Sequence, residues 1–222
     1  MKRFPLMVVA LIPMLWSTAQ AQTNQISNTL HDFSSFSWSG FEICKPCHVP
    51  HNAIAGSISP AIWNHTLSNA TYKLANGVSG TGADVLDSGS RLCLSCHDGT
   101  VALDNFGGSA MPQQLWSYIP SRYKKGPDLT PDHPVGKNAV LTDEIPGFKP
   151  VNYATGKIGT LPLYDNGHAP RVVGPGDTRK NLVVSCVSCH DAHGQGVDGP
   201  DSPKLLRVSI KQSKLCFTCH DQ

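Results

Sequence analysis

The residues best suited to carry chemistry are the eight cysteines, all of which occur in the pattern Cys-x-x-Cys-His. This pattern is typical of c-type haem attachment, because two thiols add to the vinyl groups of one haem and the next imidazole lies under the iron. The sequence therefore predicts four covalently attached c-type haems, with His48, His97, His190 and His220 as proximal iron ligands. The four copies, called here the first to fourth motifs, are Cys44-Lys45-Pro46-Cys47-His48, Cys93-Leu94-Ser95-Cys96-His97, Cys186-Val187-Ser188-Cys189-His190 and Cys216-Phe217-Thr218-Cys219-His220.

Three other interpretations of paired cysteines compete with haem attachment. Zinc ligands use the same spacing, but zinc sites rarely carry a histidine directly after every pair. Disulfides are possible in an exported protein, and thioredoxin-like redox pairs share the spacing. Neither explains a histidine after all four pairs, so haem attachment is favoured.

The sixth iron ligands must come mainly from the remaining histidines. Met111 is the only methionine outside the first 21 residues, so methionine could ligate at most one haem. Bis-histidine ligation of all four haems is therefore expected. The predicted distal ligands are His31, His51, His133 and His193, with His65 held in reserve.

Spacing suggests which haem some of these ligands serve. His51 and His193 each follow a proximal histidine by three residues, and such residues share one face of a helical turn. Each could therefore reach only a neighbouring haem, and we expect His51 at the second motif and His193 at the fourth. Asp132, which precedes His133, could orient that ring.

The other histidines have simpler interpretations. His65 competes with His31 for one haem, or it is a core histidine beside Trp63. His168, in an Asn-Gly-His sequence, is expected in a surface loop.

The motifs form two matched pairs, which indicates an internal duplication. The first and third motifs extend to Cys-x-x-Cys-His-x-x-His, whereas the second and fourth read Ser-basic-Leu-Cys-x-x-Cys-His-Asp. The expected organisation is a two-haem module at 22–110, an insertion at 111–180 that packs on the haem core, and a second two-haem module at 181–222.

Composition bears on the fold and on the partners. Ten of the 17 prolines lie in the insertion, which favours loops and turns there, and Leu182-Val183-Val184 could form a short strand. We expect a multihaem cytochrome c fold that is mostly irregular and loop-rich, with short helices, little strand and duplicated modules around a haem core. Only 15% of the residues are charged and no basic run occurs, which disfavours a nucleic-acid partner.

The first 21 residues read as a secretory signal peptide. Lys2 and Arg3 precede an apolar run that ends near Trp16, and Ala19-Gln20-Ala21 resembles a cleavage site. No second apolar run of membrane-spanning length follows. The mature protein is therefore expected to start at Gln22 and to be exported to the periplasm, the extracellular surface or both, without a membrane span.

The duplicated pattern resembles the doubled-CXXCH cytochromes of the broad cytochrome c3-like group. Further segments resemble the tetrahaem cytochromes that polymerise into extracellular filaments, the cytochrome nanowires. This resemblance implies bis-histidine haems, an irregular loop-rich fold and electron transport along stacked haems; it covers 135–180 poorly. The similar segments are His31-Asp32-Phe33-Ser34, Cys47-His48-Val49-Pro50-His51-Asn52, Trp63-Asn64-His65, the region from Leu92 to Val101, Asp132-His133-Pro134 and Leu205-Leu206-Arg207.

These observations favour an electron carrier over an enzyme, because catalysis needs an open iron position and six spare histidines are available for four irons. The resemblance favours a subunit that polymerises head to tail with copies of itself and exchanges electrons with redox proteins or extracellular acceptors. The alternative is a monomeric periplasmic shuttle or an electron-transfer subunit of a reductase complex.

Overall fold

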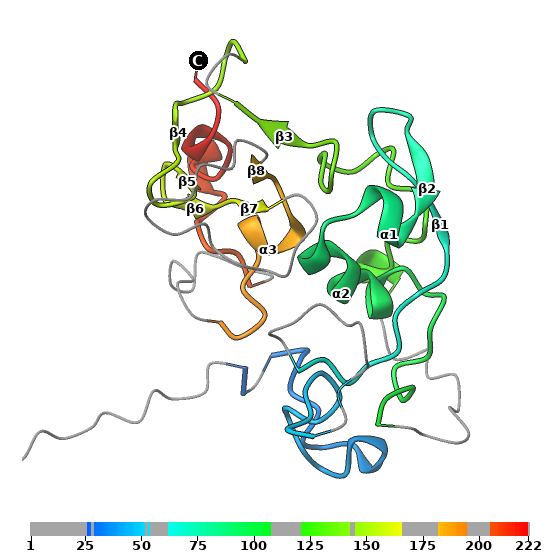
Figure 1. The fold of residues 1–222 in the computed structure, drawn as a ribbon. Helices are drawn as coiled ribbons and strands as arrows, with labels where there is room; N and C mark the ends of the chain where they lie inside the picture. Colours follow the sequence, from blue (N-terminus) through cyan, green and yellow to red (C-terminus); the bar gives the residue numbers. More distant parts are fainter. Residues whose placement is uncertain are drawn as a thin grey trace, which may run out of the picture.

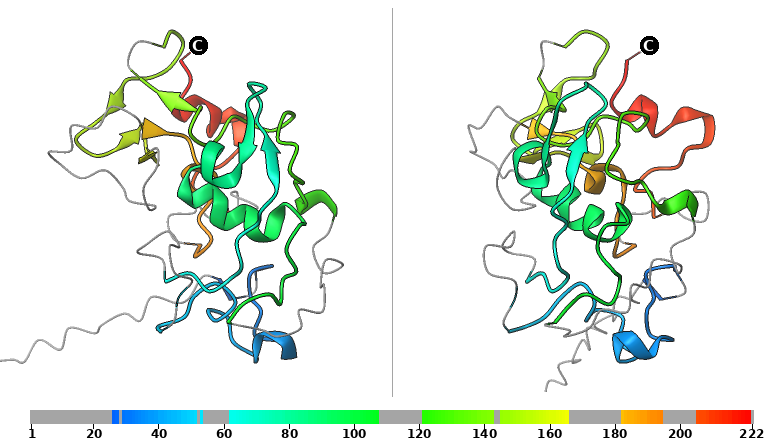
Figure 2. Two further views of the ribbon diagram at one scale, coloured as in Figure 1. Left: turned by 45° about the vertical axis from the view of Figure 1, so that its right-hand side comes forward. Right: turned by 90° about the vertical axis from the view of Figure 1, so that its right-hand side faces the viewer.

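The computed structural model describes residues 26–27, 29–51, 53, 62–107, 121–142, 145–165, 182–194 and 205–221. The expected signal peptide, Met111 and His168 lie outside these residues. The N-terminal segment lies at one end of the molecule and the C-terminal segment at the other, with the helices between them (Figures 1 and 2). Loops connect short helices and small sheets, so the loop-rich character predicted from the sequence is confirmed.

The helices among the described residues are short, and three of them, α2, α3 and η6, coincide with motifs. Helix α2 begins after Asp87, whose side chain accepts the Ser90 backbone N–H, and it ends before Gly99, which adopts φ of 75°. This is the favoured conformation of glycine just beyond a helix C-terminus. The α-helices are α1 (Gly82–Val85), α2 (Ser88–His97) and α3 (Cys186–Cys189), and the 3-10 turns are η1 (Ser37–Ser39), η3 (Ser121–Tyr123), η5 (Lys211–Ser213) and η6 (Cys216–Thr218).

A two-stranded antiparallel sheet precedes the helices. Strand β1 (Thr71–Lys73) pairs with β2 (Ser79–Thr81), so that Tyr72 faces Gly80. Gly77 lies in the intervening turn with φ of 81°, a conformation that glycine adopts without steric cost. The buried Tyr72 and Leu74 pack with residues of α1 and α2 in one apolar cluster, which positions the second motif.

The insertion contains more strand than its composition predicts. Its proline-rich sequence favours turns, yet isolated Val, Ile and Leu residues between the turns form two-residue strands whose apolar side chains are buried. One three-stranded sheet has the order β4 (Val151–Asn152), β5 (Lys157–Ile158), β6 (Leu161–Pro162). The other has the order β3 (Val140–Leu141), β8 (Leu182–Val183), β7 (Tyr164–Asp165), and β8 confirms the strand predicted there.

The two sheets share one apolar core, which lies beside the fourth motif. Cys219 and Phe148 pack against this core, so the insertion supports the fourth motif as well as α3. The buried members of the cluster are Leu141, Val151, Ile158, Leu163, Leu182 and Val184. In the part of the chain described above, no helix is long and apolar enough to cross a membrane.

Truncation of Leu182 tests how much this core contributes to the free energy of unfolding. The side chain is fully buried in the central strand β8, so Leu182→Ala should lower the free energy of unfolding by about 2–5 kcal/mol. Denaturant unfolding of the haem-loaded protein, followed by circular dichroism, measures this loss. Ile210→Ala is the control, because Ile210 is half exposed and its truncation should change stability by less than about 0.5 kcal/mol. Equal losses in the two variants would contradict the importance of this core.

Candidate haem sites

Each motif closes on itself as one helical turn. The backbone N–H of the histidine donates to the carbonyl of the first cysteine in the first, third and fourth motifs, at 2.8, 3.0 and 2.9 Å. The second motif forms the C-terminal part of α2. A helical turn brings residues three and four apart to one face, so the two thiols and the imidazole of each motif lie on the same side. This is the arrangement that attachment of one haem per motif requires.

Three proximal histidines face a second imidazole at nearly the same separation. The ring centres are 5.9 Å apart for His31 and His97, 6.0 Å for His48 and His193, and 6.4 Å for His133 and His220. A metal–imidazole bond is about 2 Å long and the ring centre lies about 1 Å behind its nitrogen, so two rings on opposite faces of one iron are about 6 Å apart. The three gaps therefore fit an iron with two axial imidazoles.

The pairing differs from the one expected from spacing. His193 faces the proximal histidine of the first motif and not that of the fourth, and His31 faces that of the second. The argument that a histidine three residues downstream reaches another haem site agrees with this placement, but the site is a different one. His51 is exposed, and no ring contact with it occurs among the described residues. His190 is also exposed, and its charge contributes to the lowered pKa of His31, after burial and His97.

Backbone carbonyls orient two of the paired rings. Nδ1 of His97 hydrogen-bonds the Tyr123 carbonyl at 2.9 Å, and Nδ1 of His133 hydrogen-bonds the Pro134 carbonyl at 3.0 Å. When Nδ1 carries the proton and donates, Nε2 is the nitrogen available to a metal. Asp132 does not orient His133 as expected from the sequence, since its carboxylate forms an ion pair with Lys125.

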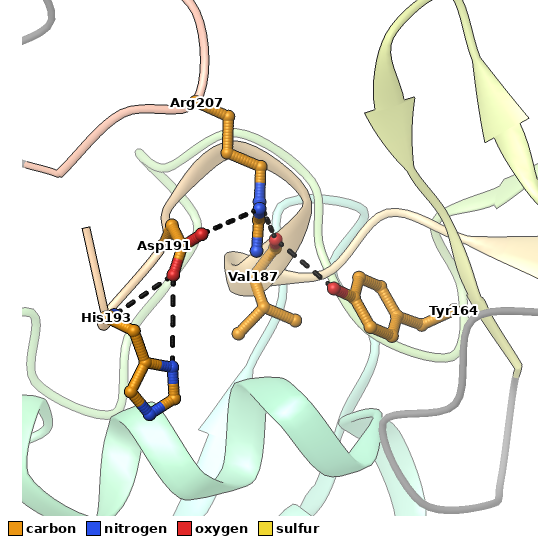
Figure 3. Close-up of polar contacts among 5 residues, drawn as sticks. All are labelled: Tyr164, Val187, Asp191, His193 and Arg207. Atoms are coloured by element: carbon orange, nitrogen blue, oxygen red, sulfur yellow. Dashed lines mark hydrogen bonds and ion pairs between the residues drawn. The ribbon is translucent and has the colours of Figure 1, made fainter. Parts of the chain in front are cut away.

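Asp191 and Arg207 position His193 (Figure 3). The Asp191 carboxylate accepts the His193 backbone N–H at 3.0 Å and lies 4.0 Å from Nδ1 of its ring. Arg207 donates to the other carboxylate oxygen at 3.0 Å and to the Val187 carbonyl at 2.9 Å. The sequence reasoning did not single out Asp191, although aspartate follows the histidine of the second, third and fourth motifs alike.

His65, the reserve ligand, lies in a different environment. Its side chain is buried, and its two ring nitrogens lie 2.9 and 3.0 Å from the carbonyl oxygens of Thr66 and Ala102, so the neutral ring can donate to one of the two. Burial lowers the pKa of its imidazole. The ring lies 3.4 Å from Sγ of Cys96, so it packs beside the second motif without facing a proximal histidine.

The neutral form of imidazole, which is the metal-binding form, is favoured at His31. Burial is the main cause, and repulsion from His97 adds to it, so the pKa of His31 falls to about 4. An imidazole with this pKa is uncharged at neutral pH, as iron ligation requires.

Two buried indoles provide a second observation relevant to a bound group. Nε1 of Trp38 and Nε1 of Trp63 are buried and have no hydrogen-bond acceptor among the described residues. Trp63 also packs edge-on against the ring of His48, with centres 5.8 Å apart. Buried N–H groups normally have an acceptor, and the propionates of a haem are acceptors of suitable chemistry.

Thiols of consecutive motifs lie close to one another. The neighbouring Cys186 thiol, followed by burial, raises the pKa of Cys93. Burial, followed by the neighbouring Cys47 thiol, raises the pKa of Cys96. Burial and then the Cys189 thiol raise the pKa of Cys219 to about 11. The motifs therefore follow one another in space in the order of the sequence, which agrees with the path of the chain in Figure 1.

The thiols are not consumed by disulfide bonds. All eight cysteines are free, so no disulfide uses them. Among the described residues, no cluster of three or more His, Cys, Asp and Glu side chains is placed to hold a metal ion by itself.

Comparison with known proteins agrees with this geometry. Residues 180–222 match the model of the doubled CXXCH motif family. No curated protein matches the chain. The matched segment contains the third and fourth motifs and coincides with the second two-haem module expected from the sequence. The motifs indicate covalently bound c-type haem, and the match supports a multihaem c-type cytochrome that acts in electron transfer.

Proposed function

We propose that the protein is a tetrahaem electron carrier with one c-type haem on each motif and two imidazoles on each iron. The observation that carries this proposal is the set of three imidazole pairs with ring centres 5.9 to 6.4 Å apart. When bound, each haem supplies one-electron chemistry at its iron. The thiols fix each haem covalently, the proximal histidines hold one face, and His31, His133 and His193 hold the opposite face of three of them.

This ligand set favours electron transfer over catalysis. A substrate needs an open coordination position, and each of the three pairs would supply a haem iron with two imidazoles of the chain. The close spacing of consecutive motifs supports an electron path from the first motif to the fourth. We also propose that the protein functions outside the cytoplasm, in the periplasm or at the extracellular surface, as its N-terminal sequence suggests.

The internal duplication supports a head-to-tail filament. His193 lies in the second module and faces the first motif, which is the first haem-attachment motif of the first module. His51 has the same place in the first module as His193 has in the second, three residues beyond the proximal histidine. In a row of copies, His51 would therefore reach the third motif of the preceding copy. Both His51 and His190 are exposed, as such a contact requires.

A contact of this kind joins two different surfaces, so it repeats without closing and builds a filament. The competing ligand for the third motif is His168 of the same chain. If His168 serves the third motif, the protein is better described as a monomeric shuttle or as a subunit of a reductase complex.

Haem content is the simplest test. We expect intact mass and a pyridine haemochrome assay to give four haems per mature chain. A double Cys216→Ser, Cys219→Ser variant should carry three, because each motif attaches one haem independently of the others. Three haems or fewer in the fully matured wild-type protein would contradict the proposal.

Axial ligation can be tested at the fourth motif. The wild-type protein should be low-spin in both redox states and should not bind carbon monoxide. His133→Ala should open one iron per chain, giving one high-spin haem and one equivalent of bound carbon monoxide, measured by optical and electron paramagnetic resonance spectroscopy. His65→Gln is the control, since that ring faces no proximal histidine, and its spectra should match the wild type. A low-spin His133→Ala protein would contradict the assignment.

Assembly can be tested by comparing two histidines. We expect His51→Ala to abolish the filaments seen by electron microscopy while four haems remain attached, and His168→Ala to leave the filaments intact. Each variant's haem content, measured on the same sample, separates lost assembly from lost maturation. A wild-type protein that stays monomeric at high concentration with four six-coordinate irons would support the shuttle instead.

A further inference from the structure

A buried carboxylate lies where the second and third motifs meet. Asp87 is 1% exposed at the start of α2, and the two serines that bind it, Ser90 and Ser185, are fully buried. The Ser90 hydroxyl donates to Oδ1 at 2.5 Å, while the Ser185 hydroxyl and the Ser90 backbone N–H donate to Oδ2 at 2.6 and 3.1 Å. An ionised carboxylate is an acceptor only, so these three donors suit its charged form.

The same residues join the two motifs directly. Ser185 caps α3, and the Ser90 hydroxyl accepts the backbone N–H of Cys186 at 3.1 Å. The Cys93 and Cys186 side chains are neighbours at this junction. A Cβ atom at Gly89 would lie 2.8 Å from Val187, so the two helices approach as closely as glycine allows. The first thioethers of the second and third haems would therefore share this junction with Asp87.

Helix capping alone does not account for the burial of a charge. Asp84 and Asp128 also accept hydrogen bonds from neighbouring threonines, but both are exposed to solvent. Burying a carboxylate carries a desolvation cost, and asparagine or serine would cap the helix equally well. Within the described residues, no cation forms an ion pair with Asp87, and three hydrogen bonds hold the carboxylate in place. A negative charge at Asp87 would act first on its neighbours, which include the Cys93 and Cys186 side chains.

We propose that the Asp87 carboxylate is a built-in negative charge that lowers the reduction potentials of the haems on the second and third motifs. This inference rests on the proposed function. A nearby negative charge stabilises the more positive, oxidised iron, and in a buried site it is weakly screened. Electrons would then reside preferentially at the terminal motifs and cross the centre of the chain without accumulating there.

The test is a redox titration of the haem-loaded, full-length Asp87→Asn protein in an optical cell. The amide oxygen of asparagine can accept the Ser185 hydroxyl and the Ser90 backbone N–H, and its NH2 group can donate to the Ser90 hydroxyl oxygen, so the network is retained while the charge is lost. We expect one or two of the four midpoint potentials to rise by about 59 mV or more. For one electron, this shift corresponds to a tenfold or larger change in the reduction equilibrium. The remaining potentials should stay at their wild-type values.

Asp128→Asn is the matched control, because Asp128 accepts the same kind of hydrogen bonds at an exposed turn, from the backbone N–H and hydroxyl of Thr130. Its four potentials should match the wild type. Asp87→Ser provides a second neutral cap and should give the same rise, which preserves the test if the asparagine variant matures poorly.

Three outcomes separate this inference from the proposed function. Four low-spin haems with unchanged potentials in both Asp87 variants would overturn the inference and leave the electron carrier intact. A lower free energy of unfolding with unchanged potentials would likewise assign Asp87 a structural role only. A wild-type protein that lacks four low-spin haems would instead overturn the proposed function itself.

Discussion

The spacing between paired imidazoles is the constraint on which the rest of the structure depends. Two rings on opposite faces of one iron must be held about 6 Å apart, and their nitrogens must point at each other. Side chains from distant parts of the sequence must meet to do this: His31 meets His97, and His133 meets His220. Long loops suit this task better than long helices, because a loop can place one ring without placing its neighbours.

The regular elements serve as fixed points for those loops. The β1–β2 hairpin and α1 support α2, which carries the second motif, and the two small sheets of the insertion support α3 and the fourth motif. Polar contacts then fix individual rings or the backbone that carries them: the Tyr123 carbonyl bonds the His97 ring, and the Asp191 carboxylate accepts the His193 backbone N–H. Much of the precision of the site therefore comes from backbone carbonyls and one buried carboxylate rather than from an extensive apolar core.

The sequence predicts the attachment chemistry well and the pairing poorly, for a physical reason. A Cys-x-x-Cys-His turn is local, so its geometry follows from five adjacent residues. The partner of His193 depends on how two modules pack, and the Gly89–Val187 approach that brings them together has no local signature. The strands of the insertion were missed similarly, since a two-residue strand such as β5 (Lys157–Ile158) has too little periodicity to be recognised. Leu182 and Val183 are an exception, because an uninterrupted apolar pair is visible locally.

The contact between His193 and His48 also bears on how the protein can mature. The ring that faces the first motif is that of His193, which follows the third motif, about two thirds of the chain further on. If the protein is exported N-terminus first, as proposed, the first motif presents its own thiols and His48 before His193 has emerged. The His193 ring would then reach that site only after the C-terminal half has followed. A chain truncated before residue 193 would keep the thiols and the proximal imidazole of the first motif but lack the His193 ring that faces it.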